Sequence, residues 1–404
     1  MARKMKDSGI DWIGEIPEGW EVVQLKRFAE VHNGREIDVE VDSTDSSAVG
    51  VYGSGGVFKY TNRAQYSGKA VLFGRKGTLG KPLYVEGQLW AVDTMYFLTY
   101  SNRLLEKFSY YQFLAFNWAP YITHTAIPSV VASEIVACYF PIPPLEEQAK
   151  IADYLDNGCA SLDTILDKTR SSIEEYKKLK QAVITQAVTK GVRGEREMKD
   201  SGVEWIGEIP KEWDILNLVA HTSMLTPMRD RPENLDGPIP WIRIEDFDGK
   251  YISSSKASLG VSKETVRSMN LKIYPVGTIL CTSSCIMGKC AIVSRELVSN
   301  QRFIGIIPDQ NTCENFLYYL MLSNSERMNY LATGALQANL SRSSFEHLKV
   351  QFPSYQEQKE ISDYLDTKCA EIDKLIAKKE QLVKELESYK KSLIYEVVTG
   401  KREV

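Results

Sequence analysis

The side chains that could perform covalent chemistry in this 404-residue chain do not form a catalytic motif. Gly288-Lys289-Cys290 lacks the upstream glycine and the hydroxyl of a phosphate-binding loop. Asp309, Glu357 and Lys359 resemble the charged groups of a nuclease, but the last two open a predicted helix rather than lie on a strand. No Asn-Pro-Pro or Asp-Pro-Pro precedes an aromatic residue, and no glycine-rich dinucleotide or methyl-donor loop opens a helix. We therefore expect no covalent chemistry.

Metal ligands are equally sparse. The closest cysteines are Cys281, Cys285 and Cys290, and they lack a fourth zinc ligand at a workable spacing. The four histidines show no metal spacing: His32, His124, His221 and His347. Gly53-x-Gly55-Gly56 is a lone glycine turn, which is more simply a chain reversal than a phosphate site. The sequence predicts no metal and no cofactor in this chain.

Composition and charge narrow the class of protein. The chain is 43% hydrophobic, contains no apolar run that could span a bilayer and has no apolar signal core after residues 1–7, so we expect a cytoplasmic protein without a membrane segment. Seven cysteines without a repeated Cys-x-x-Cys indicate reduced thiols. The net charge is −4, yet residues 50–140 carry eight basic against four acidic residues, and residues 241–345 carry eleven against eight. These basic regions are compatible with DNA binding.

The sequence is an internal repeat. Residues 5–20 return as residues 198–213 with 12 of 16 positions identical, including Trp12 as Trp205 and Trp20 as Trp213. Residues 147–190 return at 357–400 with an offset of 210, and Asp153-Tyr154-Leu155-Asp156 is unchanged there. The chain therefore consists of two modules, about 1–197 and 198–404. Each module has a shared entrance, a divergent middle and a shared helical exit.

Both exits predict long amphipathic helices with apolar positions spaced four and three residues apart, as in a coiled coil. The predicted seam residues are Leu162, Leu166, Ile173, Tyr176, Val183, Ile372, Ile376, Val383, Leu386 and Leu393. Thr169 and Lys379 interrupt the two seams at matching places. Because a compact lobe has its ends close together, the second helix should run antiparallel to the first.

The divergent middles, roughly 21–140 and 214–350, alternate short strand patterns with turns and one helical stretch. The predicted fold class is α/β (α+β): two globular lobes separated by an antiparallel coiled coil of two long helices, with an internal pseudo-two-fold repeat. The predicted segments are 1–144 (first lobe), 145–197 (first helix), 198–354 (second lobe) and 355–404 (second helix).

The repeated frame resembles the DNA-specificity (S) subunit of bacterial type I restriction–modification enzymes. The matching stretches are residues 7–20, 145–156, 187–191, 200–213, 355–366 and 397–400. The resemblance implies a non-catalytic subunit whose two target-recognition domains select a bipartite, asymmetric site in double-stranded DNA. It also implies two modification (methyltransferase) subunits and restriction/translocase subunits as partners, which would hold S-adenosylmethionine, ATP and Mg.

Within the lobes, loop lysines and arginines would contact phosphates, while arginine, asparagine and glutamine can bond to base edges. For the first lobe we predict Lys59, Asn62, Arg63, Arg75, Lys76 and Lys81. For the second lobe we predict Arg243, Ser283, Ser284, Lys289, Asn300, Gln301 and Arg302. Each residue has an alternative role as an ordinary surface or turn residue. Trp90 and Trp241 are more simply explained as lobe core.

The helix length carries a further expectation. About 30 helical residues from Ala160 to Lys190 span roughly 45 Å, and DNA half-sites one helical turn apart are about 34 Å apart. The helix would then set the spacing of two half-sites. Two other classes are alternatives: a self-contained DNA methyltransferase or nuclease, which lacks its motifs here, and a coiled-coil protein-interaction scaffold.

Overall fold

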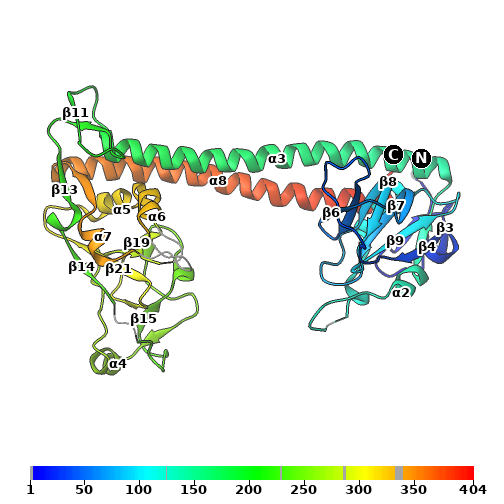
Figure 1. Cartoon of the computed structure of the whole chain (residues 1–404), viewed down its shortest axis with the longest axis horizontal. Coiled ribbons are helices and arrows are strands. Elements are labelled where there is room, and N and C mark those ends of the chain that lie inside the picture. Colours follow the sequence, from blue (N-terminus) through cyan, green and yellow to red (C-terminus); the bar gives the residue numbers. More distant parts are fainter. Residues whose placement is uncertain (1–2, 124, 228–229, 285–287, 333–339) are drawn as a thin grey trace. The chain divides into compact units, whose positions relative to one another are not determined.

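The computed structural model describes residues 3–123, 125–227, 230–284, 288–332 and 340–404. The chain divides into two compact units. Unit 1 comprises Met1–Ser171 and Glu380–Val404, and unit 2 comprises Ser172–Lys379. The boundaries fall within the two long helices, so each unit holds part of both (Figure 1). The predicted segments separate lobes from helices along the sequence, whereas compactness groups each lobe with the helix segments that it packs against.

The long helices are α3 (Leu145–Lys190) and α8 (Tyr355–Val398). In unit 1, Lys390 bonds to Asp163 at 2.6 Å. In unit 2, Lys180 bonds to Asp373 at 2.7 Å, and these are the same two positions of the repeat. A second ion pair in each unit, Arg170 with Glu387 and Arg193 with Glu360, lies later along the first segment and earlier along the second, so the predicted antiparallel pairing is confirmed within each unit. No helix in the described part of the chain combines the length and apolar character needed to cross a membrane.

The predicted seam is buried in each unit. Five of its residues are buried and the other five are half-buried, whereas most flanking positions are exposed. The polar break at Thr169 is buried because its hydroxyl donates to the Ile165 carbonyl at 2.7 Å. The second break is accommodated differently, since the Lys379 ammonium lies 5.7 Å from the centre of the Tyr176 ring.

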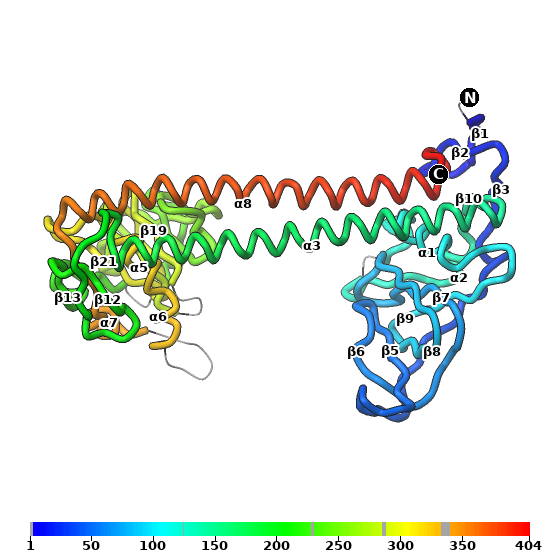
Figure 2. The backbone as a smooth tube through the Cα atoms, turned by 90° about the horizontal axis from the view of Figure 1, so that it is seen from above, coloured from blue at the N-terminus to red at the C-terminus, as the bar shows by residue number. Residues whose placement is uncertain are grey.

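Both long helices start after prolines and end before glycines. Pro144 and Pro353 lie just ahead of the two helix starts, where the restricted backbone cannot extend the preceding strand. Gly191 and Gly400 follow the helix ends with φ of +76° and +71°, the left-handed conformation that glycine adopts without cost. A Cβ added to Gly400 would lie 2.4 Å from Pro17. The end of α8 therefore packs closely on the entrance hairpin, as Figure 2 shows.

The frame elements recur in both units. The entrance hairpins are β1 (Met5–Asp7) with β2 (Glu15–Pro17) and β11 (Met198–Asp200) with β12 (Glu208–Pro210). The strand pairs that close each lobe are β3 (Glu21–Gln24) with β10 (Tyr139–Ile142) and β13 (Asp214–Asn217) with β22 (Lys349–Phe352). Short 3-10 helices follow at Leu25–Arg27 and Leu218–Ala220.

The lobe of unit 1 contains a six-stranded sheet in the order β4-β9-β7-β8-β5-β6. Its strands are β4 (Ala29–Asn33), β5 (Val49–Gly53), β6 (Gly56–Thr61), β7 (Tyr66–Gly74), β8 (Leu83–Ala91) and β9 (Met95–Tyr100). Helices α1 (Glu106–Ala115) and α2 (Ala132–Ala137) and a 3-10 turn (Ala119–Tyr121) follow. Alternate residues of β7 enter different cores. Val71 and Phe73 pack with α1, whereas Ala70 and Leu72 pack with β8 and β9 residues. This explains the continuous apolar run in that strand.

The lobe of unit 2 contains a five-stranded sheet in the order β14-β21-β18-β19-β16 and a three-stranded sheet in the order β17-β15-β20. The strands are β14 (Thr222–Leu225), β15 (Ile239–Ile242), β16 (Tyr251–Ile252), β17 (Gly260–Val261), β18 (Ile279–Thr282), β19 (Cys290–Val293), β20 (Val298–Ser299) and β21 (Phe303–Pro308). The helices are α4 (Lys263–Ser268), α5 (Glu314–Ser323), α6 (Ser325–Leu331), α7 (Arg342–Glu346) and a 3-10 turn (Ile244–Asp246).

The two divergent lobes share a core topology, to which unit 2 adds the strand β16. The central strand β7 lies between β8 and β9, as β18 lies between β19 and β21, and all four pairings are antiparallel. Gly74 pairs with Met95, and Thr282 pairs with Phe303, so both partners are displaced by 208 residues. In unit 1, β5 pairs in parallel with β8, and in unit 2, β15 pairs in parallel with β20. The predicted internal repeat therefore extends through the middles, where the sequences differ.

Candidate nucleic-acid interface

Arg75 and Ser283 occupy the same place in the two lobes. Arg75 follows the central strand β7, and its backbone N–H donates to the Thr94 carbonyl at 2.7 Å. Ser283 follows the central strand β18, and its backbone N–H donates to the Arg302 carbonyl at 2.8 Å. In both lobes, the segment after the central strand therefore contacts the turn that precedes its paired strand, β9 in unit 1 and β21 in unit 2.

Lys81 and Lys289 are also equivalent. In the register of β7 with β8, Lys81 lies two residues before Leu83, the partner of Leu72. In the register of β18 with β19, Lys289 lies two residues before Ala291, the partner of Leu280. Both lysine side chains are exposed. The two equivalent stretches, residues 75–81 and 283–289, share the Gly-Lys pair at their ends and differ in the five residues before it. A lysine thus occupies the same place in both lobes, after stretches of different sequence.

Segments of unit 2 that are distant in the sequence lie around the turn at residues 300–302. The parallel strands β15 and β20 are paired at their ends, so Arg243 and Asn300 leave the sheet side by side. Arg302 contacts Ser283 through the backbone. We call residues 243, 283–284, 289 and 300–302 the loop cluster of unit 2. It contains all seven residues predicted for this lobe.

The corresponding segments of unit 1 meet around the turn at residues 92–94. The backbone N–H of Val92 donates to the Tyr52 carbonyl at 3.1 Å, which joins this turn to β5, and Thr94 joins it to Arg75. The link from β6 to β7, which includes Asn62 and Arg63, approaches the same turn through Gln65, whose side chain accepts from the Ala91 N–H at 3.0 Å. We call residues 52–56, 62–65, 75–82 and 92–94 the loop cluster of unit 1.

The predicted residues differ in how freely they face solvent. The exposed ones are Lys59, Asn62, Arg63, Lys76, Lys81, Lys289, Gln301 and Arg302. Lys59 lies on β6 outside the loop cluster and is paired with Glu40 at 2.7 Å. Arg75 is half-buried, with its guanidinium 5.7 Å from the Tyr96 ring centre. Ser284 is buried, and the Asn300 side chain accepts the Arg302 N–H at 3.0 Å. The Asn300 side chain therefore shapes the turn at residues 300–302, and the Ser284 side chain is not exposed.

Two residues beside the loop cluster of unit 1, Arg35 and Phe58, were absent from the sequence prediction. Arg35 is exposed, and its backbone N–H donates to the Ala91 carbonyl at 2.9 Å, which places it beside the loop cluster of unit 1. The signal for this approach is Gly34, where a Cβ would lie 1.9 Å from the Val92 carbonyl oxygen. Phe58 is exposed on β6 and packs against Gly53 of the turn. Trp241 is buried in the lobe core, whereas Trp90 is half-buried and its indole N–H donates to the Arg35 carbonyl at 2.8 Å.

The repeated Asp-Tyr-Leu-Asp motif attaches each lobe to its long helix. In unit 1 the Tyr111 hydroxyl donates to Asp156 at 2.5 Å and Lys107 pairs with the same carboxylate at 3.1 Å. In unit 2 Tyr319 donates to Asp366 at 2.6 Å and Lys250 completes the set. Burial, followed by the bond to aspartate, raises the pKa of both tyrosines. The neutral phenols are therefore held as hydrogen-bond donors.

The repeated Glu-Gln pair at each helix start joins two further elements. Trp20 Nε1 donates to Glu147 at 3.1 Å, and Trp213 Nε1 donates to Glu357 at the same distance. The side chains of Gln148 and Gln358 accept the first backbone N–H groups before α1 and α5, each at 2.8 Å. Sequence repetition alone located this motif, and the contacts give its structural reason.

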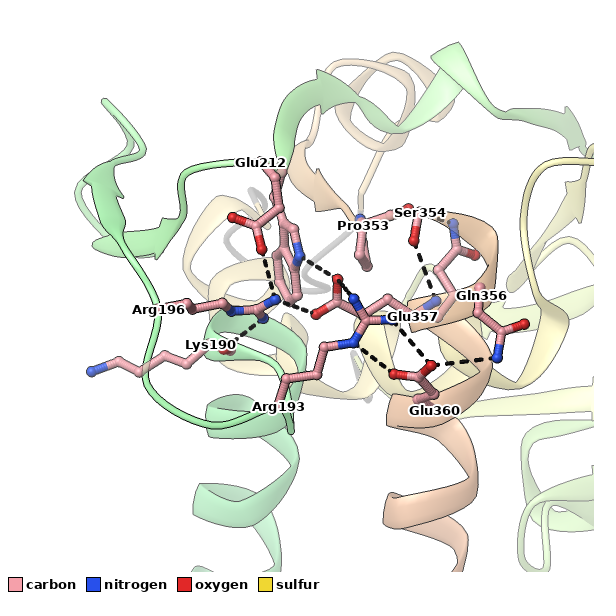
Figure 3. Close-up of polar contacts among 11 residues, drawn as sticks. Lys190, Arg193, Arg196, Glu212, Pro353, Ser354, Gln356, Glu357 and Glu360 are labelled. Carbon is pink, nitrogen blue, oxygen red and sulfur yellow. Dashed lines mark hydrogen bonds and ion pairs between the residues drawn. The ribbon is translucent and has the colours of Figure 1, made fainter.

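Figure 3 shows the more buried of the two Glu-Gln sites. Glu357 is 2% exposed and accepts from Arg196 at 2.7 Å. The Arg196 guanidinium also donates to the Lys190 carbonyl at the end of α3 at 3.0 Å and lies 5.2 Å from the Trp213 ring centre. Arg193 pairs with Glu360 at 2.8 Å. This cluster connects the end of α3, the start of α8 and the second entrance.

The long helices also expose matching apolar side chains. Unit 1 exposes Leu145, Tyr154, Ile165 and Tyr389, and unit 2 exposes Tyr355, Tyr364, Leu375 and Leu179. Each residue of the first set is related to one of the second by the 210-residue offset. Their exposed fractions lie between 36% and 48%. Both units therefore carry the same apolar positions on surfaces that the seam does not cover.

The residues considered for covalent or metal chemistry have other contacts. Glu357 is engaged by Arg196 and Trp213, Asp309 lies 3.1 Å from His221, and Lys359 lies over the Tyr355 ring. Cys281 and Cys290 face each other on buried strands, and burial raises the pKa of Cys281. Cys285 and His124 lie outside the described residues. Across the described ranges, no three His, Cys, Asp or Glu side chains are grouped to hold a metal.

These features define a class of protein: two α/β lobes of one core topology, each attached to paired helices through the same Glu-Gln and Asp positions. The family model "Type I restriction modification DNA specificity domain" matches residues 17–175 and 214–385. The chain belongs to this family, whose members serve as specificity subunits and not as the catalytic subunits. The resemblance to type I specificity subunits that the repeated frame indicated is confirmed.

Curated relatives bear the corresponding name. The MjaIX specificity subunit of Methanocaldococcus jannaschii is 34% identical over 181 residues, which are 43% of this chain and 41% of that protein. The putative MjaX specificity subunit of the same organism is 25% identical over 96% of this chain and 95% of its own. The EcoKI specificity subunit of Escherichia coli K12 is 26% identical over 48% of this chain and 44% of its own.

Solved structures confirm the fold. A chain from a study of complex assembly and conformational transition in a type I R-M system has a TM-score of 0.74 at 14% identity, covering 96% of this chain and 99% of that one. The HsdS subunit from Thermoanaerobacter tengcongensis has a TM-score of 0.50 at 14% identity, with 96% and 98% covered.

Proposed function

We propose that this chain selects the DNA site of a type I restriction–modification complex, with each loop cluster reading one half of a bipartite, asymmetric site in double-stranded DNA. The observation that carries the proposal is that the two lobes share one core topology and differ in their loop clusters. A shared scaffold presents residues in equivalent positions, and different residues there would read different half-sites.

The chemistry of the loop clusters supports this division of labour. Lys76, Lys81 and Lys289 are exposed cations suited to phosphate oxygens, which provide affinity without sequence information. Gln301 and Arg302 are exposed groups that can make paired hydrogen bonds to bases. Both clusters combine a cation with neighbouring polar side chains, as a base-reading surface requires.

The repeated apolar positions support two copies of one partner. Tyr154 with Ile165 in unit 1 and Tyr364 with Leu375 in unit 2 offer the same contacts to a protein surface. Two modification subunits would dock on these helix faces, and restriction/translocase subunits would join the same complex. S-adenosylmethionine, ATP and Mg would be bound by those partners, and the complex would act in the cytoplasm, where the DNA lies.

The test maps methylated adenines in the source genome with and without this gene. The expected result is loss of one bipartite methylated motif on deletion. The double variant Gln301→Ala/Arg302→Ala should relax one half of that motif, and Lys76→Ala/Lys81→Ala should weaken binding with a smaller salt slope and little change in sequence preference. An unchanged methylation pattern after deletion, or methyl transfer by the purified chain without partners, would contradict the proposal.

A further inference from the structure

A hollow of about 680 Å³ lies beside the first repeated tryptophan in unit 1. It is bounded by the turn at residues 9–12, the segment at 116–121 that follows α1, and the end of α2. Trp12, Phe116, Tyr121 and Tyr139 supply its aromatic walls. Phe116 is buried, meets the Trp12 ring edge-on at 5.8 Å and forms the floor, while the other three rings remain partly open to solvent.

The charges around this hollow are negative. Asp11 and Glu134 line it and are exposed, and no lysine or arginine lines it in the described part of the chain. Within that part, neither carboxylate forms an ion pair or a side-chain hydrogen bond. Aromatic faces together with free carboxylates attract a cation and repel phosphate groups. The hollow is therefore unsuited to DNA, although it belongs to the same unit as the first loop cluster.

In unit 2 an arginine of the same unit lies over the equivalent tryptophan, whose outer part is exposed. Trp205 is the repeat of Trp12, and the Arg327 guanidinium carbon lies 4.0 Å from its ring centre. The Tyr330 ring lies 4.9 Å from the same guanidinium. Arg327 belongs to α6, the segment that follows α5, as residues 116–121 follow α1. Residues 116–121 contain no arginine or lysine. The same tryptophan thus has an internal cation in one module and an open hollow in the other.

We propose that the hollow beside Trp12 binds an arginine side chain of a partner protein. Arginine fits better than lysine because its planar guanidinium stacks on an aromatic face while its N–H groups reach Asp11 and Glu134. That the partner is a subunit of the restriction–modification complex rests on the proposed function, whereas the cation site does not. Because Arg327 already lies over Trp205 in unit 2, only the Trp12 site would take an arginine from a partner, and two copies of a partner would meet unequal surfaces.

The first experiment labels the seven tryptophans of the full chain with 5-fluorotryptophan and follows them by ¹⁹F NMR. The Trp12→Phe and Trp205→Phe variants assign the two resonances. N-acetyl-arginine amide should shift the Trp12 resonance in a saturable manner and leave the Trp205 resonance in place. N-acetyl-citrulline amide, which has nearly the same shape without the charge, should shift neither. A Trp12 resonance that does not move with arginine, or moves equally with citrulline, overturns the cation site.

Variants of this chain provide the reciprocal test. Asp11→Asn/Glu134→Gln should weaken arginine binding at Trp12 several-fold, and Arg327→Ala should make the Trp205 resonance respond to the arginine amide. A Trp205 resonance that stays unresponsive in Arg327→Ala would refute the equivalence of the two sites. The other tryptophan resonances report whether each variant retains its fold.

The partner assignment has its own readout. In the complex reconstituted with its modification subunits, Asp11→Asn/Glu134→Gln should lower partner retention several-fold at unchanged DNA sequence preference. Unchanged retention by a variant that has lost arginine binding overturns the partner assignment alone. Failure of the unaltered chain to direct methylation would instead count against the proposed function, and the ¹⁹F result would still stand.

Discussion

At the scale of single residues, the repeated Glu-Gln pair shows how one motif can sit in two electrostatic environments. Glu357 and Arg196 have side chains only 2% and 14% exposed, whereas Glu147 and Arg3 are 25% and 28% exposed. A buried ion pair is costly to break because removal of one partner leaves the other charge in a poorly solvated place. The two copies of the motif therefore differ in how much stability depends on their arginine.

Replacement of Arg196 and of Arg3 should lower the stability of the chain by different amounts. Arg196→Ala is expected to lower the free energy of unfolding by about 3 kcal/mol because it leaves the buried Glu357 carboxylate with weaker partners. Arg3→Ala, the matched control, should cost about 1 kcal/mol or less because water reaches Glu147. Urea unfolding followed by circular dichroism measures both. Equal losses in the two variants would show that burial does not set the cost.

Tyrosine ionisation gives a second prediction at this scale. Burial, and next the Glu86 carboxylate, raises the pKa of Tyr84 to about 12, and burial, followed by the bond to Asp156, also raises the pKa of Tyr111. Unfolded tyrosine ionises near pH 10, so above that pH the unfolded chain releases protons that the folded chain retains. Stability should therefore be full below about pH 10 and fall as the pH rises beyond it.

The measurement is urea unfolding between pH 8 and about 11.5, with absorbance at 295 nm reporting phenolate. Tyr111→Phe and Tyr319→Phe should be less stable at neutral pH and lose stability less steeply in alkali, because each removes one retained proton. A slope equal to that of the unaltered chain would contradict the assignment. Tyr60→Phe, at a tyrosine outside this helix attachment, is the control.

At the scale of elements, each long helix is followed by a glycine with a positive φ, and the two glycines have different neighbours. Gly400→Ala places a Cβ 2.4 Å from Pro17 at φ +71°, whereas Gly191→Ala places one 1.9 Å from the movable tip of Arg196 at φ +76°. Both substitutions should cost about 1 kcal/mol through the left-handed backbone. Gly400→Ala should cost more because a proline ring on the entrance hairpin cannot move aside as a side-chain tip can.

Thermal unfolding of the two alanine variants and of Gly194→Ala tests this order. Gly194 has open space around a new Cβ and lacks a positive φ, so its substitution should be close to neutral. A Gly400→Ala variant as stable as Gly194→Ala would show that the end of α8 does not pack on the entrance hairpin in solution.

Elements were predictable where one stretch of sequence carried the whole signal. The seam residues Leu162 and Ile372 could be predicted because spacing along one helix determines which face is buried. The lysines at the helix attachments could not, since Lys107 lies on α1 and Lys250 precedes β16, although both reach equivalent aspartates. Arg35 was missed for a related reason. Its position depends on strand pairing between residues far apart in the sequence, which no local pattern encodes.

At the scale of the whole molecule, the two units are joined through the interiors of α3 and α8, because the unit boundaries fall at residues 171–172 and 379–380. The number of residues that link the two lobes is therefore set by the lengths of α3 and α8. The expectation from the sequence was that helix length sets the spacing of the two half-sites. That expectation can be examined without any change to the loop clusters, since those clusters lie outside the long helices.

Insertion of one heptad after Ser171 and another after Lys379 gives the last prediction. Seven residues preserve the seam register and lengthen each helix by about 10 Å, the rise of about three base pairs. The methylated motif should keep both half-sites and gain about three base pairs of spacer. The control replaces residues on the exposed face at the same place without changing helix length, and it should leave the motif unaltered. A lengthened chain that methylates the original motif at the original spacing would refute the ruler role, because the half-sites would then be positioned by something other than the helices.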